Sequence, residues 1–194
     1  ILSKLKSLNL DQNTIVIFTS DNGGETKVTS NAPLRGGKSQ LYEGGIRVPL
    51  IVSWPDAISP SRVSTHPTSN VDFYPTLLEA AKIPANVQQP LDGISLLKTW
   101  KHPDASPKRR ALFWHYPLEK PHFLGGVSSG AIRLSNWKLI ENFTNNSIEL
   151  FNISKDPSES VNLTKKKPTL SKSLLNELIA WRKLIGATKN PPKR

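Results

Sequence analysis

The spacing of apolar residues at the start of the chain predicts an amphipathic helix. Ile1, Leu2, Leu5 and Leu8 recur at helical spacing, and lysines stand between them. No N-capping residue precedes this run. We therefore expect the sequence to begin inside a helix and to represent the carboxyl-terminal portion of a longer protein.

Two apolar runs rich in β-branched residues follow, at 14–19 and 48–54. The first has the pattern of a strand buried on both faces, as in a parallel sheet covered by helices. Between the two runs, residues 20–47 show little periodicity and contain six glycines. Unstructured connections of this length in a compact domain are usually functional. Further along, Asp72 is expected to cap a helix that extends through Lys82.

The second half of the chain has the pattern of an antiparallel sheet followed by a helix. Short apolar runs separated by turn residues predict closely connected strands. An apolar stripe then predicts a helix over residues 170–185, with Gly186 as its stop. The strands are expected at residues 111–115, 130–134, 137–140 and 148–152.

The predicted fold class is therefore α/β, with two parts. Residues 1–105 would belong to a mixed-sheet domain, and residues 106–194 would form a small antiparallel sheet with a packed carboxyl-terminal helix. The boundary is placed in the polar, proline-containing stretch 101–108, which has the composition of a linker.

Composition limits the chemistry that these residues can supply. The 194 residues include no cysteine, which excludes disulfides, thiolate metal ligands and a cysteine nucleophile within them. No apolar run approaches the roughly 18 residues of a membrane-spanning helix. The net charge of +11 is concentrated in residues 151–194, which hold ten basic and three acidic residues. Since that stretch lacks interleaved aromatic residues, we interpret it as a solvated basic surface and expect no nucleic-acid partner.

The residues that follow the first predicted strand suit a metal site. Asp21 and Asn22 stand at the carboxyl end of that strand, where ligands collect in α/β sheets. A carboxylate and an amide carbonyl are hard oxygen donors, which suit Ca²⁺ or Mg²⁺. The alternative is a simple turn, because Asp, Asn and Gly each favour turns.

A glycine-rich, cationic stretch comes next, at residues 35–47. It combines Arg35, Lys38 and Arg47 with four glycines. Glycine lets backbone N–H groups approach an anion, while the cations neutralise its charge. The stretch does not match a P-loop. It predicts an anion cradle, and three cations on a solvated loop are the alternative.

These motifs, in this order, resemble the second half of a type I sulfatase, an arylsulfatase-like enzyme of the alkaline phosphatase superfamily. The resemblance covers nearly the whole chain. It is carried by Asp21-Asn22-Gly23-Gly24, Ala32 to Lys38, Leu41 to Pro49, Val71 to Leu78, Leu91 to Leu97, Ala131-Ile132-Arg133, Trp137 to Ile140, Glu149 to Asn152 and Asp156 to Leu163.

The resemblance implies a role for several of these residues. Asp21 and Asn22 match the acidic-amide pair that binds the active-site calcium. Lys38 matches the lysine that contacts the sulfate group and assists catalysis. Arg35 and Arg47 belong to the same motif, but bracing of the loop, for instance by pairing with Glu43, is an equally good interpretation.

The resemblance also implies a nucleophile that this sequence does not contain. The family uses a formylglycine made from a Cys or Ser in a Cys/Ser-x-Pro-x-Arg motif, which is absent here. That motif, further calcium aspartates and a catalytic histidine are expected upstream. The chain alone is therefore expected to be inactive. The implied substrate is a sulfate ester, with sulfated polysaccharide as one class, and the implied location is periplasmic, secreted or lysosomal.

Histidines in the second half are further candidates for substrate contacts. His115, within Leu112 to Pro117, resembles a motif of some polysaccharide sulfatases in which carboxyl-terminal residues border the substrate cleft. A histidine at a strand end is equally compatible with packing or hydrogen bonding. His122 is a weaker candidate.

Two alternative functions stay open at this point. A phosphatase or phosphodiesterase of the same superfamily would use a similar metal and cationic loop. A non-catalytic module that binds polyanions would depend instead on the basic run Lys165-Lys166-Lys167.

Overall fold

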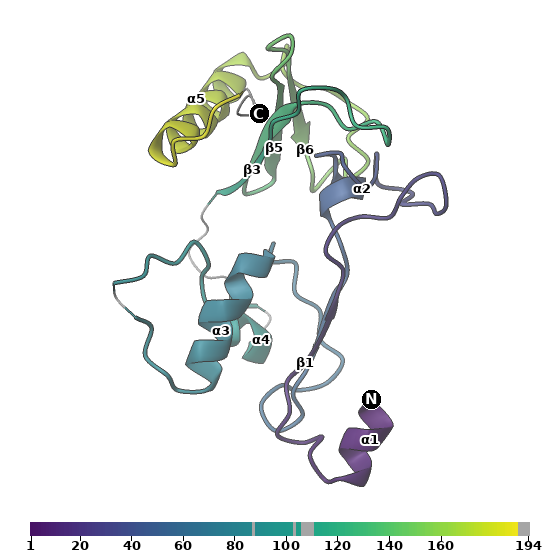
Figure 1. Cartoon of the computed structure of the whole chain (residues 1–194), viewed down its shortest axis with the longest axis vertical. Helices are drawn as coiled ribbons and strands as arrows, with labels where there is room; N and C mark the ends of the chain where they lie inside the picture. Colours follow the sequence, from purple (N-terminus) through teal and green to yellow (C-terminus); the bar gives the residue numbers. More distant parts are fainter. Residues whose placement is uncertain (87, 103, 106–110, 190–194) are drawn as a thin grey trace. The chain divides into compact units, whose positions relative to one another are not determined.

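The structure, a computed structural model, describes residues 1–86, 88–102, 104–105 and 111–189. The chain forms two compact units (Figure 1). Unit 1 contains residues 1–19 and 50–109, and unit 2 contains residues 20–49 and 110–194. Part of the predicted linker, residues 103 and 106–108, lies outside the described residues, and the domain boundary near residue 105 stays a prediction.

Unit 1 is built from short helices and a two-stranded sheet. Its core is formed by Leu96, Leu97 and Trp100, against which apolar side chains of the sheet and of the neighbouring helix pack. The elements are α1 (Leu2–Ser7), β1 (Val16–Thr19), β2 (Leu50–Ser53), η1 (Asn70–Asp72), α3 (Phe73–Ala80) and α4 (Leu97–Lys101).

The expectation that the first strand is buried in a parallel sheet is wrong for this structure. β1 pairs with β2 in antiparallel register, with Phe18 opposite Ile51. Both of these side chains are mostly exposed, at 63% and 61%. The apolar run identified the strand correctly, but it carries no information about the direction of the strand's neighbour.

Asp72 occupies the N-cap position of α3, as predicted, but its side chain makes no capping hydrogen bond to that helix. Its Oδ2 atom accepts a hydrogen bond from the Ser69 N–H at 2.8 Å, and its Oδ1 atom accepts one from the Ile94 N–H at 2.9 Å. The reason is that the 3-10 turn η1 precedes α3, so Asp72 already has helical dihedral angles. Its carboxylate joins two loops instead of capping the helix.

Unit 2 confirms the predicted antiparallel sheet and carboxyl-terminal helix. The four strands lie in the order β3-β4-β5-β6, and each pairs antiparallel with its neighbour. Gly186 ends the helix with a φ of +65°, a conformation that glycine adopts without strain. The elements are α2 (Glu43–Ile46), β3 (Leu112–Tyr116), β4 (Ser129–Leu134), β5 (Trp137–Asn142), β6 (Ile148–Asn152) and α5 (Pro168–Leu184).

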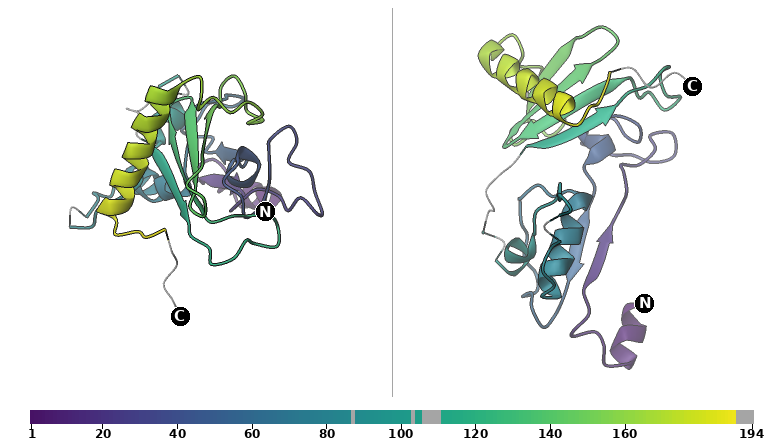
Figure 2. Two further views of the ribbon diagram at one scale, coloured as in Figure 1. Left: turned by 90° about the horizontal axis from the view of Figure 1, so that it is seen from above. Right: turned by 60° about the vertical axis from the view of Figure 1, so that its left-hand side comes forward.

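The two faces of this sheet have different coverings. Helix α5 packs on one face, where Leu174 and Leu178 contact a buried cluster from β4, β5 and β6. On the opposite face, Leu41 and Tyr42 of the glycine-rich segment pack against a second cluster, which includes Phe151. Figure 2 shows the sheet between α5 and the segment that contains α2. Among the described residues, no helix combines the length and apolar character required to cross a bilayer.

Candidate active site

Three glycine pairs bring separate parts of the segment 20–49 into contact, an arrangement we call the glycine crossing. The Gly23 N–H donates to the Gly45 carbonyl at 2.9 Å, and the Gly44 N–H donates to the Arg35 carbonyl at 2.7 Å. The Lys38 N–H donates to the Gly24 carbonyl at 3.1 Å. The residues of the crossing are Gly23, Gly24, Gly36, Gly37, Gly44 and Gly45.

Close backbone approach explains why these positions are glycine. A Cβ atom on Gly23 would lie 1.7 Å from the Gly44 carbonyl oxygen. One on Gly45 would lie 2.0 Å from the Gln40 carbonyl oxygen. Both distances are far shorter than van der Waals contact. A side chain at either position would therefore push apart the backbone segments that meet in the crossing.

Asn31 fastens the crossing from one side, a role that the sequence did not reveal. Its Nδ2 group donates to the carbonyls of Gly24 at 2.8 Å and Gly36 at 3.1 Å, and its Oδ1 atom accepts from the Gly24 N–H at 2.9 Å. Asn31 directly precedes the motif that runs from Ala32 to Lys38, and nothing else in the sequence pointed to it. One amide side chain thus satisfies three backbone groups.

Asp21 and Asn22 lie side by side immediately before the crossing. The Asn22 Nδ2 group donates to Asp21 Oδ2 at 2.6 Å. The Asp21 side chain is exposed, while Asn22 is half-buried. The pair offers carboxylate oxygens and, with the amide in its flipped orientation, an amide oxygen at one point.

This donor set fits part of a calcium site. Ca²⁺ takes about six to eight oxygen ligands, and carboxylate and amide oxygens are among its usual donors. In the described part of the chain, no group of three or more His, Asp or Glu side chains is arranged to hold a metal. Asp21 and Asn22 are therefore suited to supply some of the ligands of such a site.

Lys38 is the cation of the glycine-rich stretch for which the described residues provide no carboxylate partner. Its side chain is exposed, and no carboxylate among the described residues pairs with its ammonium group. Its backbone is held at the crossing, so the side chain starts from a fixed point close to Asp21 and Asn22. The structure thus brings together these three predicted site residues within one loop system.

The two arginines of the stretch brace the loop, in agreement with one of the predicted interpretations. Arg47 NH1 lies 3.8 Å from Glu43 Oε2. Arg35 lies over the Tyr42 ring, with 3.8 Å from its Cζ to the ring centroid, and its NH1 is 3.4 Å from Glu149 Oε1. Both guanidinium groups therefore have intramolecular partners, while their side chains stay 41% and 53% exposed.

A buried charge network connects α2 to the sheet. The Lys138 ammonium lies 3.0 Å from Glu43 Oε1 and 2.9 Å from Glu159 Oε1, and all three side chains are at most 1% exposed. The Glu43 N–H donates to Glu159 Oε2 at 2.6 Å. Burial raises the pKa of Glu159, and the positive charge of Lys138 opposes that rise. Arg133 NH1 stands 3.7 Å from Glu43 Oε2 at the edge of the network.

Tyr42 adds a second link between the loop and the sheet. Its hydroxyl donates to Glu149 Oε2 at 2.5 Å. Burial raises the pKa of Tyr42, and the hydrogen bond and negative charge of Glu149 raise it further. The phenol therefore stays protonated and keeps donating at neutral pH.

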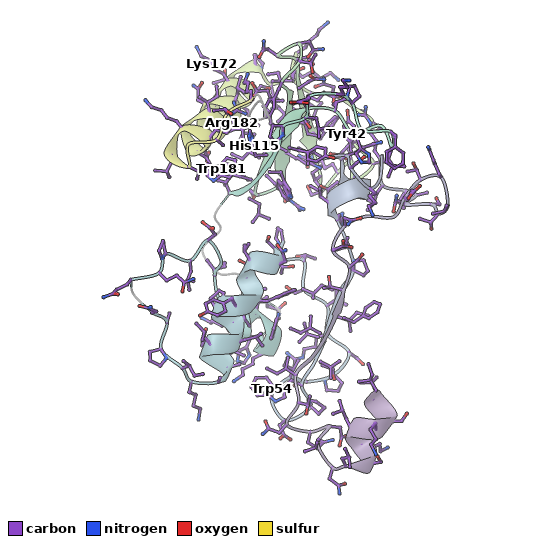
Figure 3. The ribbon with its side chains drawn as sticks, in the orientation of Figure 1. Tyr42, Trp54, His115, Lys172, Trp181 and Arg182 are labelled. Atoms are coloured by element: carbon purple, nitrogen blue, oxygen red, sulfur yellow. The ribbon has the colours of Figure 1, made fainter. Side chains whose placement is uncertain are left out.

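The structure places His115 away from these residues. Its side chain is on the face of the sheet that α5 covers, where the ring centroids of His115 and Phe143 are 5.3 Å apart. His115 Nε2 lies 2.9 Å from the Thr188 carbonyl oxygen. Figure 3 shows Tyr42 and Trp181 on opposite sides of the sheet. The structure therefore does not bring His115 together with Lys38, and its assignment as a substrate contact stays a prediction.

Several named proteins are similar to this chain in sequence. The family model "Sulfatase" matches residues 1–83. A sulfatase of Formosa agariphila is 36% identical over 190 residues, which cover 91% of this chain and 34% of the relative. Arylsulfatase J of Mus musculus is 31% identical, covering 97% of this chain and 38% of the relative. The chain thus spans little more than a third of the length of these relatives.

Solved structures share the fold. Ps i-CgsB in complex with k-i-k-neocarrahexaose superimposes with a TM-score of 0.82 at 30% identity, covering 93% of this chain and 39% of that chain. A protein in complex with its substrate D-glucosamine-2-N,6-O-disulfate superimposes with a TM-score of 0.74 at 26% identity, covering 94% and 36%. The predicted α/β class with the alkaline phosphatase-like fold is confirmed. The chain therefore belongs to the sulfatase family and represents a part of such a protein.

Proposed function

We propose that this chain contributes the calcium-binding pair and the sulfate-contacting lysine of a sulfate-ester hydrolase. Asp21 and Asn22 would be the calcium ligands, and Lys38 would contact the sulfate. The observation that carries the proposal is the hydrogen bond from the Lys38 N–H to the Gly24 carbonyl, which holds the Lys38 backbone against a residue two positions along the chain from Asn22. Membership of the sulfatase family supports the reaction class.

The chemistry proposed for Lys38 follows from the absence of a carboxylate partner for its ammonium group among the described residues. An ammonium group is a compact charge that can contact a sulfuryl oxygen from several directions. It would hold the ester and stabilise negative charge that develops as the S–O bond breaks. Calcium, when bound, would supply further polarisation of the sulfuryl oxygens. We propose that the nucleophile is a formylglycine in sequence outside these 194 residues.

We further propose a sulfated carbohydrate as the substrate class. Two structural neighbours were solved with carbohydrates, one of which is a disulfated glucosamine named as the substrate. The net charge of +11 favours approach of a polyanion. By the same family relationship, we propose a location in the periplasm, the secretory route or the lysosome.

The metal assignment is tested by calorimetric calcium titration of a protein that joins this chain to the proposed formylglycine segment, because Asp21 and Asn22 supply only some of the ligands of the site. Asp21→Asn removes a charged ligand and should weaken calcium binding by at least about tenfold. Asp56→Asn is the matched control, because Asp56 is an exposed carboxylate of unit 1. Equal calcium affinity of Asp21→Asn and the unmutated chain contradicts the assignment.

The role of Lys38 is tested by turnover in a protein that joins this chain to the proposed formylglycine segment. Lys38→Ala should lower kcat/KM for an aryl sulfate by about 10²- to 10³-fold, the usual effect of removing one transition-state charge contact. Lys172→Ala, at an exposed position of α5, serves as the control. Wild-type kinetics of Lys38→Ala contradict the role.

The same proteins and variants distinguish a sulfate-ester hydrolase from the two alternative functions. A phosphatase or phosphodiesterase of the superfamily would hydrolyse an aryl phosphate faster than the aryl sulfate. A polyanion-binding module would turn over neither, and its binding would fall when Lys165-Lys166-Lys167 are neutralised but not in Lys38→Ala.

A further inference from the structure

A tight turn between β3 and β4 holds an aromatic ring in solvent. The His122 N–H donates to the Gly126 carbonyl at 2.7 Å, and the Gly125 N–H donates to the His122 carbonyl at 2.8 Å. Gly125 has a φ of +88°, which favours glycine at this position. Phe123, inside this turn, is 74% exposed. We call residues 121–127 the aromatic turn.

The aromatic turn is attached to the residues that follow Lys38. The Gln40 Nε2 group donates to the Leu124 carbonyl at 3.0 Å. A Cβ atom on Gly126 would lie 2.1 Å from the Ser39 carbonyl oxygen, so the two backbones are in direct contact. The exposed ring is therefore fixed beside the loop that carries the proposed sulfate ligand.

Two nitrogen-bearing side chains flank the ring. Lys27 Nζ lies 5.2 Å from the Phe123 centroid, within cation–π distance. The His122 ring stacks on Phe123 with centroids 4.5 Å apart. His122 Nδ1 accepts the Leu124 N–H at 3.2 Å, which leaves the proton of a neutral ring on Nε2 as a donor.

We infer that Phe123, His122 and Lys27 form a subsite for a sugar unit adjacent to the one that carries the scissile sulfate. A pyranose ring has an apolar face that stacks on an aromatic ring, and sulfate or hydroxyl groups at its edge suit the flanking donors. A hollow lined in part by Gln40, Tyr42 and Gly125 opens beside the same turn. The inference rests on the proposed function, because Lys38 defines where the scissile sulfate lies.

The test is calorimetric binding of a heparin-derived hexasaccharide to the 194-residue chain at low and high salt. Phe123→Ala should weaken the affinity about tenfold or more, and the loss should persist at high salt because stacking is not screened. Phe123→Tyr should bind nearly as tightly as the unmutated chain. Phe18→Ala is the matched control, since Phe18 is a 63% exposed ring in unit 1.

The second arm separates this inference from the proposed function. 4-Nitrocatechol sulfate, a small ester, is titrated into Lys38→Ala and Phe123→Ala. Lys38→Ala should weaken its binding, and unchanged binding would count against the proposed function alone. Phe123→Ala should lose more affinity for the hexasaccharide than for the small ester. Equal losses for both probes, wild-type affinity of Phe123→Ala for the hexasaccharide, or absence of hexasaccharide binding by the unmutated chain would each overturn the subsite.

Discussion

The ammonium group of Lys138 lies 3.0 Å from Glu43 Oε1 in a place where the two side chains are 0% and 1% exposed. Lys138 comes from β5, and Glu43 begins α2. The Oε1 atom of Glu159 lies 2.9 Å from the same ammonium nitrogen. Because Lys38 lies five residues before Glu43, this buried pair anchors the segment of the proposed sulfate ligand to the sheet.

Removal of Lys138 should therefore be strongly destabilising. Lys138→Met keeps most of the side-chain volume but leaves the Glu43 and Glu159 carboxylates buried with their nearest cation lost. Breaking one partner of a buried ion pair costs about 3–5 kcal/mol. The free energy of unfolding, measured with urea, should fall by that amount.

The control for this substitution is Lys172→Met, on the exposed side of α5 (Figure 3). Loss of an exposed lysine should change the free energy of unfolding by no more than about 0.5 kcal/mol. Equal free energies of unfolding for Lys138→Met and Lys172→Met would show that the buried charge network does not hold the segment containing Glu43 on the sheet.

Much of unit 2 could be predicted from sequence because its signals are local. Strands β3 to β6 alternate with turn residues, and α5 has an apolar stripe that ends at a glycine. The two-stranded sheet of unit 1 was harder. The apolar runs identified β1 and β2, but strand direction depends on long-range pairing, which a single run does not encode.

The site shows the same division between local and long-range information. Asp21, Asn22 and Lys38 could be proposed as site residues because they belong to compact motifs, and the backbone contacts of the glycines bring these motifs together. His115 lies on the other face of the sheet, and the partners of Glu43 come from residues about 95 and 116 positions away in sequence. Strand alternation indicates two faces, but only packing decides which one receives the glycine-rich loop.

A side chain at the glycine crossing should disrupt the metal pair. Gly23→Ala places a methyl group 1.7 Å from the Gly44 carbonyl oxygen, so one backbone must move. We expect a loss of about 1–3 kcal/mol in the free energy of unfolding, the usual cost of overpacking. Because Gly23 directly follows Asn22, calcium affinity measured by calorimetry should also fall by at least about tenfold.

Gly186→Ala provides the comparison for that experiment. No heavy atom lies within 4 Å of the added methyl, but φ is +65°, so the cost is backbone strain of about 1 kcal/mol. Calcium affinity should be unchanged in Gly186→Ala. Full calcium affinity in Gly23→Ala would show that the crossing does not position the metal pair.

The contact between α5 and the sheet should depend on Leu178. This side chain is 0% exposed and belongs to the cluster formed with Ile132, Leu139 and Leu150. Leu178→Ala should lower the free energy of unfolding by about 2–5 kcal/mol, since it creates a cavity in a closed cluster. Leu184→Ala, at an 84% exposed position of the same helix, should cost less than about 0.5 kcal/mol. Similar losses for the two variants in urea unfolding would contradict this packing.

Asp156 should give unit 2 a defined acid sensitivity. Partial burial by itself would raise its pKa, but the Val161 and Ser160 N–H groups and the hydroxyls of Ser158 and Ser160 donate to the carboxylate and lower the pKa to about 2. The folded pKa is thus below the unfolded value of about 3.9. Stability from this group is fully present above pH 4 and is lost as the pH falls through about 2.

Asp156→Asn cannot titrate, so the free energy of unfolding measured from pH 5 to pH 2 should fall less steeply for this variant than for the unmutated chain. Parallel pH profiles would show that the loop hydrogen bonds do not favour the ionised carboxylate.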